Sequence, residues 1–168
     1  MPNYRRDYSG TVWFFTVVTH RRRPLFRDYR ARATLRSAIF ECRERYPFDV
    51  PAWVLLPDHL HCIWALPDHD RNYSRRWSVI KRRFTQLAGA ETRLRAPFWQ
   101  KRFWAHRIDT DESYRAHTDY IHFNPVKHGL VERVCDWRWS SFHRVVENGL
   151  YPADWGGGIE FPITIGRE

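Results

Sequence analysis

The stretch Ala52-Trp-Val-Leu-Leu-Pro-Asp-His-Leu-His-Cys-Ile-Trp-Ala-Leu66 contains the features that decide the fold. Apolar, β-branched and aromatic residues fill it on both sides of Pro57-Asp58. A Pro-Asp pair between two such runs favours a tight reversal of the chain. The sequence therefore predicts two strands, residues 52–56 and 59–66, that pair antiparallel.

The second of these strands contains a histidine pair, His59 and His61. In an extended chain alternate side chains share a face, so the two imidazoles project one way while Leu60, Cys62 and Trp64 project the other. Two imidazoles on one face can bind a single divalent ion, although a His-x-His pattern alone is more often polar packing. The pair predicts a metal site only if a second segment adds ligands.

A second segment, Tyr120-Ile-His-Phe-Asn124, lies in a predicted helix that Thr110 or Asp111 caps and that Pro125 ends nearby. Tyr120 and Asn124 are four residues apart and share a helix face. Laid against the histidine pair, this face offers Asn124 as a third ligand and Tyr120 as a nucleophile. The structural alternatives are a tyrosine that only packs its ring and an Asn-Pro helix end.

Other side chains compete for the third position. His122 lies about 200° around the helix from Tyr120, whereas His128 follows the expected helix end. A zinc site that uses a cysteine is a further alternative, but Cys62 projects from the opposite face of its strand. Two imidazoles and one amide oxygen, with open positions, favour Mg²⁺ or Mn²⁺ over a closed zinc site.

The remaining elements follow from hydrophobic periodicity and capping signals. They are a strand at 11–19, a helix at about 28–46, a helix from Ser74 to about Ala88, a strand near 98–108, the Tyr120 helix and a last helix ending near Glu147. The order βαββαβα, with two βαβ-like halves, predicts an α+β protein with a ferredoxin-like antiparallel sheet and helices packed on it. We expect one domain, residues 1–147, and a C-terminal tail, residues 148–168.

The composition indicates a polyanionic partner. The 168 residues have a net charge of +9 and contain only three lysines among 28 basic residues, so arginine dominates. Arginine binds phosphate through two parallel hydrogen bonds and stacks on bases, which favours nucleic acid. The candidate DNA-binding residues come from basic stretches interleaved with aromatics and from the Tyr120 helix; they are Arg21, Arg22, Arg75, Arg82, Arg83, Lys101, Arg102 and Lys127.

Several classes of protein are disfavoured. The three cysteines, Cys42, Cys62 and Cys135, form no Cys-x-x-Cys motif, and no apolar leader precedes the first strand, so we expect a reducing, cytoplasmic setting. No apolar run approaches the roughly 20 residues that span a bilayer, which predicts no membrane partner. No glycine-rich phosphate loop is present, which predicts no nucleotide cofactor.

The sequence resembles a known family, the REP-associated tyrosine transposases, where REP stands for repetitive extragenic palindrome. They are relatives of the small single-tyrosine HUH insertion-sequence transposases. The resemblance spans roughly residues 11–143 and rests on FFTVVTHRRRPLF, AWVLLPDHLHCIW, RRWSVIKRRF, FWQKRFWAHRI, YIHFNPVKHGLV and WRWSSF, in that order. Its one departure is Leu56, where relatives often have methionine. The departure affects no residue expected to take part in catalysis.

The resemblance implies that His59 and His61 bind the divalent ion, that Asn124 completes the site and that Tyr120 attacks the phosphate. It also implies the HUH single-tyrosine nuclease fold, a single-stranded DNA substrate with a palindromic hairpin, a monomer, and a tail that regulates access to the DNA site. An edge strand or a lid is the structural alternative for that tail.

The expected function is a metal-dependent single-stranded DNA endonuclease and strand transferase that forms a 5′-phosphotyrosine intermediate. One alternative is a noncatalytic nucleic-acid hairpin-binding protein whose histidines are structural. The other is a metal-dependent nuclease in which water attacks and Tyr120 only packs.

Overall fold

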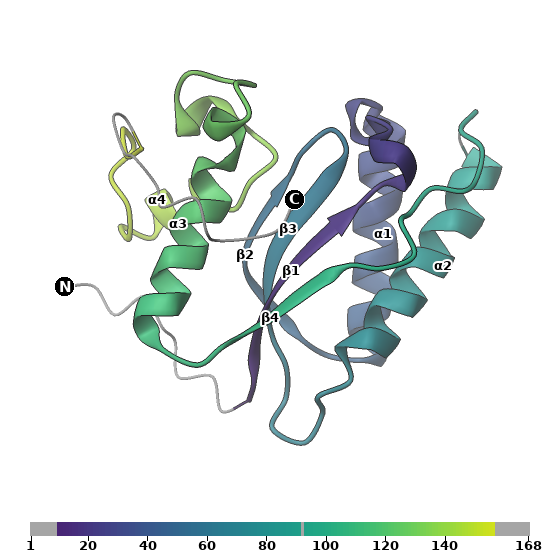
Figure 1. Ribbon diagram of the computed structural model, residues 1–168, viewed down its shortest axis with the longest axis horizontal. Helices are drawn as coiled ribbons and strands as arrows, with labels where there is room; N and C mark the ends of the chain where they lie inside the picture. Colours follow the sequence, from purple (N-terminus) through teal and green to yellow (C-terminus); the bar gives the residue numbers. More distant parts are fainter. Residues whose placement is uncertain (1–9, 92, 157–168) are drawn as a thin grey trace.

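The fold is built on one four-stranded antiparallel sheet. The computed structural model describes residues 10–91 and 93–156. The strands are β1 (Val12–Val18), β2 (Asp49–Leu55), β3 (His59–Ala65) and β4 (Trp104–Ile108), in the spatial order β2-β3-β1-β4 (Figure 1). All three strand pairs are antiparallel. This order confirms the predicted ferredoxin-like α+β sheet.

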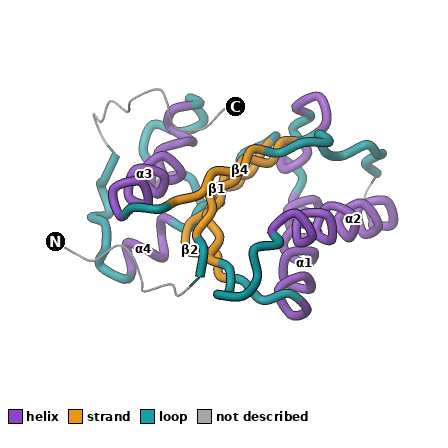
Figure 2. Tube along the Cα trace, turned by 60° about the horizontal axis from the view of Figure 1, so that its bottom comes forward, coloured by secondary structure: helices purple, strands orange, loops and turns teal. Residues whose placement is uncertain are grey.

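Helices cover both faces of the sheet. Helices α1 (Tyr29–Arg45) and α2 (Tyr73–Glu91) pack side by side on one face, while α3 (Asp111–Lys127) and α4 (Phe142–Glu147) lie on the other (Figure 2). Three short 3-10 turns complete the connections: η1 (His20–Arg22), η2 (Leu25–Arg27) and η3 (Val134–Asp136). The predicted order of strands and helices is confirmed.

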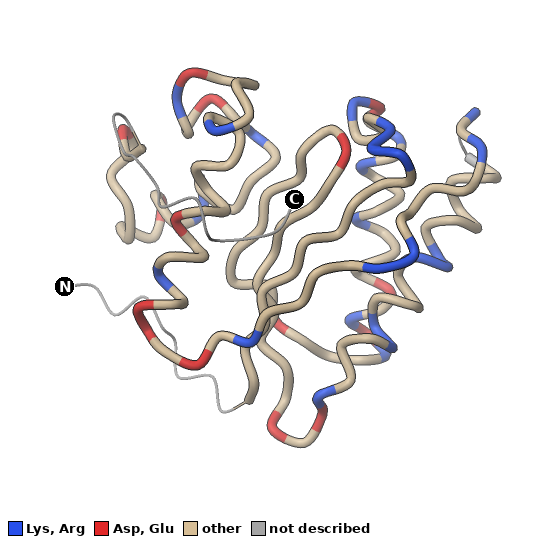
Figure 3. The backbone as a smooth tube through the Cα atoms, in the orientation of Figure 1, with Lys and Arg blue, Asp and Glu red and all other residues tan. Residues whose placement is uncertain are grey.

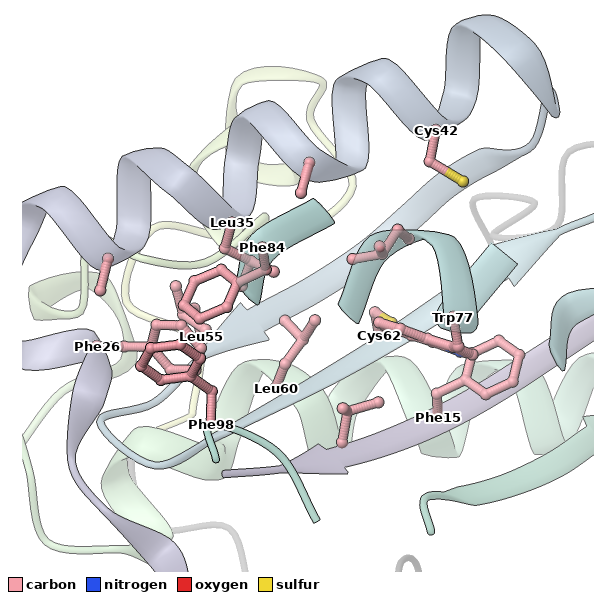
Figure 4. Packing of buried hydrophobic residues seen from close by; sticks show 14 of the residues in the cluster. Phe15, Phe26, Leu35, Cys42, Leu55, Leu60, Cys62, Trp77, Phe84 and Phe98 are labelled. Carbon is pink, nitrogen blue, oxygen red and sulfur yellow. The ribbon is translucent and has the colours of Figure 1, made fainter. Parts of the chain in front are cut away.

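Strand β3 is buried along its whole length, and its side chains point alternately into two hydrophobic cores, one on each face of the sheet. Leu60, Cys62 and Trp64 point into the core beneath α1 and α2, where the Trp64 ring stacks on Trp77 of α2 with centroids 4.2 Å apart. Figure 4 shows Cys62, Trp77 and Phe15 of β1 meeting in this core. Each such large side chain stabilises the fold by about 1.5–3 kcal/mol when fully buried.

The opposite face of the same strands forms the core beneath α3. Ile63 of β3 and Phe14 of β1 meet Tyr120 and Ile121 of α3 there. The register of β1 and β3 places Thr16 across from His61 and Val18 across from His59. The sequence alternation thus sends both histidines to the α3 face, as predicted.

Some element boundaries differ from the predicted ones. β2 begins at Asp49 and contains Pro51, which is tolerated because β2 is an edge strand with an irregular register there. The expected strand at 98–108 is confined to Trp104–Ile108. Before it, Phe98 turns inward against Phe84, with ring centroids 5.5 Å apart, and Trp99 forms only an isolated bridge to Thr19. On α2, helical spacing from Ile80 and Phe84 predicts that Leu87 points inward, but Leu87 is half-buried and Ala88 is fully buried instead.

The outer edge of β2 is covered by a segment that precedes α4. The Leu55 amide donates to the Trp139 carbonyl, and the Ser141 amide donates to the Trp53 carbonyl, both at 2.9 Å. Ser141 Oγ also accepts from the Trp53 amide at 2.9 Å. This segment satisfies backbone groups that an edge strand otherwise exposes to water.

Residues 148–156, the first part of the predicted tail, pack on the folded domain. Tyr151 is 6% exposed, donates a hydrogen bond to Asp119 of α3, and packs edge-on against Trp155 and Phe142. The rest of the predicted tail, residues 157–168, lies outside the described residues, so its regulatory role stays a prediction.

Two observations concern a membrane span and the state of the cysteines, both of which the sequence addresses. Within the described ranges, no helix has both the length and the apolarity needed to cross a bilayer. Cys42, Cys62 and Cys135 are all free thiols.

The packing of α3 against α4 predicts a pH dependence of stability. His122 is fully buried and hydrogen-bonds Ser141 Oγ at 3.0 Å. Burial, with a smaller effect from Arg144, lowers the pKa of His122 from 6.5 to about 3. The unfolded imidazole binds a proton below about pH 6.5 and the folded one does not, so stability is lost as the pH falls from about 6.5 toward 3.

We expect His122 to contribute about 2 kcal/mol to the loss of unfolding free energy between pH 7 and pH 5. Urea denaturation of the wild type and of His122→Gln at both pH values measures this, because glutamine keeps a polar partner for Ser141 but does not titrate. An equal loss in both proteins would contradict the assignment.

Candidate active site

The histidine pair on β3 forms the floor of the candidate site. His59 is 1% exposed and His61 is fully buried. Their ring centroids are 4.8 Å apart and their planes are nearly perpendicular, at 82°. Two neighbouring imidazoles in a dry site can point two ring nitrogens at one ion.

Asp58 and Arg22 orient His59. The His59 Nδ1–H donates to Asp58 Oδ1 at 2.7 Å, and Arg22 Nη1 contacts Asp58 Oδ2 at 3.2 Å. Burial alone raises the pKa of the Asp58 carboxyl, but its hydrogen bonds and charge interactions with His59 and Arg22 outweigh this and lower it. The carboxylate therefore stays charged and fixes His59 with Nε2 as the remaining ring nitrogen.

Thr16 orients His61 in the same way. A hydrogen bond of 2.9 Å joins Thr16 Oγ1 to His61 Nδ1, across the register pair of β1 and β3. This partner occupies Nδ1 and leaves Nε2 as the nitrogen suited to a ligand. Neither Asp58 nor Thr16 was among the site residues predicted from the sequence. The signal for Asp58 is its position directly before His59.

Tyr120 lies beside the pair. Helix α3 begins where Thr110 Oγ1 accepts from the Ser113 amide at 3.1 Å, as its predicted cap requires. Three turns later the Tyr120 ring packs edge-on against His61, with centroids 5.3 Å apart. Tyr120 is 5% exposed, and Asn124, one turn further on the same face, is fully buried. One chain thus brings the predicted nucleophile to the predicted metal ligands.

Lys127 lies against the Tyr120 hydroxyl. Its Nζ donates to Tyr120 Oη at 3.1 Å and lies 4.9 Å from the centre of the ring. The contact exists because α3 continues two residues beyond Pro125, whereas the sequence predicted an end near the proline. Residues seven apart return to the same helix face, which is the sequence signal for this pair. The sequence alone predicts only a DNA-binding role for Lys127.

The competing ligands differ in their placement. His122 points into the core around Phe142 and Tyr151, away from the histidine pair. The His128 ring packs against His59, with centroids 5.2 Å apart. Across residues 10–91 and 93–156, no three His, Cys, Asp or Glu side chains are grouped to hold a metal ion. A zinc site with a cysteine therefore has no support, and Cys62 lies in the core on the other face.

The donor set fits a divalent metal. His59 Nε2 is buried with no hydrogen-bond partner among the described residues, which is costly unless a ligand satisfies it. Each histidine has its Nδ1 bound to an oxygen, the arrangement that metal-ligating imidazoles adopt. His59 and His61, with the amide of Asn124, are therefore the residues that would hold such an ion.

A basic rim adjoins His59. It consists of Arg21, Arg22, Lys101 and Arg102, all exposed, from the turn after β1 and the segment before β4. Backbone bonds bring these segments together: the His20 amide donates to the Phe98 carbonyl at 2.8 Å. Figure 3 shows basic residues at the η1 end of α1 and along the chain entering β4. The rim places positive charge beside Asp58 and His59, where it is suited to phosphate contacts.

Two residues of this rim have a strained backbone conformation. Arg21 and Arg22 have φ values of 52° and 51°, in the left-handed region that side chains other than glycine rarely adopt. Arg22 reaches Asp58 from this conformation. Strain of about 1–3 kcal/mol per residue is typical of positions that a functional site constrains.

Three other predicted DNA-binding residues lie elsewhere. Arg75, Arg82 and Arg83 are on α2, which covers the opposite face of the sheet from Tyr120. Arg83 forms a two-pronged ion pair with Glu41 of α1, at 2.6 and 3.1 Å. Arg75 stacks on the Tyr46 ring. These three arginines are not brought together with the site, and their role in DNA binding stays a prediction.

Comparison with known proteins gives consistent matches. The family model described as Transposase IS200 like matches residues 11–124. The chain is 48% identical over 162 residues to the REP-associated tyrosine transposase of Escherichia coli (strain K12), covering 95% of this chain and 93% of that protein. A relative from Haemophilus influenzae is 42% identical over 174 residues, covering 97% and 98%.

A solved structure extends the match to three dimensions. It is a REP-associated tyrosine transposase bound to a REP hairpin, with a TM-score of 0.83 and 45% identity over 100% of this chain and 98% of that one. The chain therefore belongs to the IS200-like transposase family, in its group of REP-associated tyrosine transposases, which are enzymes that cleave and rejoin DNA.

Proposed function

We propose that this protein binds a palindromic hairpin and cleaves the single-stranded DNA beside it, with Tyr120 as the nucleophile. The observation that carries the proposal is the packing of Tyr120 against His61, with Lys127 on its hydroxyl. The hairpin substrate is inferred from the 45% identical structure that holds a REP hairpin. Arg21, Arg22, Lys101 and Arg102 would hold the backbone of the same DNA.

His59, His61 and Asn124 would hold a Mg²⁺ or Mn²⁺ ion. When bound, such an ion polarises the scissile phosphate and offsets the charge that develops on its oxygens. Asp58 and Thr16 keep the two imidazoles aimed and in the correct tautomer. These roles are supported by the donor set and by the buried His59 Nε2.

Lys127 would stabilise the charged form of the nucleophile. A protonated lysine donates hydrogen bonds and accepts none, so it cannot remove the phenol proton, which passes to water or another base. Its charge stabilises the phenolate that attacks, and the same phenolate when it leaves during rejoining. Tyr120 is buried whereas Lys127 is exposed, so water partly screens the interaction between them.

The proposed cleavage exchanges one phosphate ester for another. Tyr120 Oη forms a bond to phosphorus, the bond from phosphorus to the 3′ oxygen breaks, and that oxygen takes up a proton to become a 3′-hydroxyl. The product is a 5′-phosphotyrosine. In rejoining, a 3′-hydroxyl attacks the same phosphorus and releases Tyr120, so no nucleotide cofactor is needed.

One chain supplies every residue of this site, with the histidines on β3 and the tyrosine on α3. We therefore propose that the monomer is the catalytic unit.

We expect Tyr120→Phe to abolish a covalent DNA adduct while it binds the hairpin with wild-type affinity. Incubating the protein with a labelled single strand carrying a palindrome, with Mn²⁺ or with EDTA, and running a denaturing gel measures the adduct. Tyr114→Phe is the matched control, because Tyr114 is also a buried tyrosine on α3.

Cleavage that persists in Tyr120→Phe would overturn the nucleophile and indicate attack by water. Hairpin binding with no cleavage under any metal would indicate a noncatalytic binding protein.

We expect Lys127→Met to slow cleavage about 100-fold with less than about a threefold change in hairpin affinity. Lys127→Arg should keep most of the rate, because it keeps the charge beside Tyr120 Oη. Single-turnover cleavage rates and hairpin titrations separate the two effects. A parallel loss of affinity and rate would instead assign Lys127 to DNA binding, the role predicted from the sequence.

We expect Asp58→Asn to weaken Mn²⁺ binding about 10- to 100-fold in the absence of DNA, because the charged partner of His59 is lost. Calorimetry or electron paramagnetic resonance of Mn²⁺ titrations measures this. Asp136→Asn is the control, since Asp136 belongs to η3 and pairs with Arg133 on the exposed surface. Equal Mn²⁺ affinity in Asp58→Asn and the wild type would remove Asp58 from the site.

A further inference from the structure

Helix α1 carries a stripe of alternating aromatic and arginine side chains on its outer surface. Tyr29, Arg36, Phe40 and Arg43 are spaced by seven, four and three residues. At about 100° per residue, all four fall within about 60° of one another around the helix. We call this set the α1 stripe.

The α1 stripe is not needed for the core. Tyr29 and Phe40 are 65% and 62% exposed, and they are two of the three exposed large hydrophobic side chains among the described residues. The helix packs on the sheet through its other side, with Ala31, Leu35 and Ala38. Two exposed aromatic side chains on the same face of a helix indicate an interaction surface.

A groove of about 1190 Å³ runs beside the α1 stripe. The stripe forms one wall, the edge of β2 with Trp53 and Trp139 lines the floor, and Arg144 of α4 belongs to the far side. A fourth arginine, Arg32, lies with its guanidinium 4.1 Å from the centre of the Trp139 ring. The groove thus combines aromatic rings with positive charge from two helices.

The charge of the groove is complementary to a polyanion. Its lining contains four arginines, Arg32, Arg36, Arg43 and Arg144, and one acidic residue, Asp49. Asp49 lies 3.8 Å from Arg43, so it offsets only one of the four. A second copy of this chain would bring the same positive surface, which disfavours self-association through this face.

We propose that the α1 stripe and its groove bind single-stranded nucleic acid, by stacking bases on Tyr29 and Phe40 and by phosphate contacts to Arg36 and Arg43. Grooves that bind single strands without sequence preference combine these two contacts. The stripe is about 21 Å long, since 14 residues each rise 1.5 Å, and about six stacked nucleotides at 3.4 Å cover that length.

This groove is separate from the candidate active site. Helix α1 covers the face of the sheet opposite to Tyr120, and the groove is lined by α1 and by the edge strand β2. A strand that reaches both must pass around that edge. This inference rests on the proposed function, which supplies the ligand, single-stranded DNA. In it, α1 binds the part of the strand that flanks the cleavage site.

The test uses the full chain and an oligothymidine of about 16 nucleotides, the upper end of known site sizes, in EDTA. Without a hairpin or a metal, neither cleavage nor hairpin recognition contributes, so failure here is distinguishable from failure of the proposed function. We expect the double variant Tyr29→Ser/Phe40→Ser to bind about 5- to 150-fold more weakly for each stacked base lost. Arg36→Ser should weaken binding and flatten its salt dependence.

Arg133→Ser is the matched control, because Arg133 is an exposed arginine outside the groove, and it should bind like the wild type. Photo-crosslinking with iododeoxyuridine should label peptides that contain Tyr29 or Phe40. Thermal melting confirms that each variant is folded, as expected for exposed positions.

Wild-type affinity in both the aromatic double variant and Arg36→Ser would overturn the proposal. So would crosslinks confined to peptides outside the groove. Self-association of the wild type on gel filtration that the aromatic double variant loses, with unchanged affinity for oligothymidine, would instead assign the α1 stripe to a contact between copies of this chain.

Discussion

The antiparallel pairing of β1 with β3 is the contact on which the rest of the structure depends. Its register places Thr16 beside His61 and fixes which face of β3 meets each layer of helices. Because side chains alternate along a strand, a slip of one residue would send His59 and His61 into the core beneath α1 and α2. It would also bring Leu60 and Cys62 to Tyr120. Burial of both faces makes such a slip costly.

Each histidine of the pair and the proposed nucleophile has a hydrogen-bond partner that fixes its position. His59 is held by Asp58 at the start of β3, His61 by Thr16 of β1, and the Tyr120 hydroxyl by Lys127. A polar group buried without a partner is costly, so a buried site of this kind persists only when its geometry is fixed. The sheet and α3 therefore position the candidate site before DNA arrives. Pre-positioned groups of this kind contribute most of the rate enhancement in many enzymes.

Much of this arrangement could be predicted from the sequence, because it follows from local periodicity. The alternation through His59–Trp64 and the helical spacing of Tyr120 and Asn124 each identify a face. What periodicity cannot show is where a turn or a helix end places a side chain. Lys127 reaches Tyr120 because α3 passes Pro125, and Arg22 reaches Asp58 from a left-handed backbone.

Sequence periodicity also cannot predict what the exposed side chains of the helices contact. Periodicity places Arg83 off the core but does not reveal that Glu41 of α1 binds it. It places Tyr29 and Phe40 on one side of α1 but does not reveal the groove beside them, whose floor includes Trp139, about 100 positions later in the chain. Long-range packing of this kind requires the fold.

In the proposed mechanism Tyr120, next to the histidine pair, becomes covalently linked to DNA. Mass spectrometry of the nuclease-digested adduct formed with Mn²⁺ tests it most directly, because it locates the nucleotide on a residue. We expect a 5′-phosphonucleotide on the peptide that contains Tyr120 and a free 3′-hydroxyl on the released strand. A nucleotide on any other residue, or cleaved DNA with no modified peptide, would contradict it.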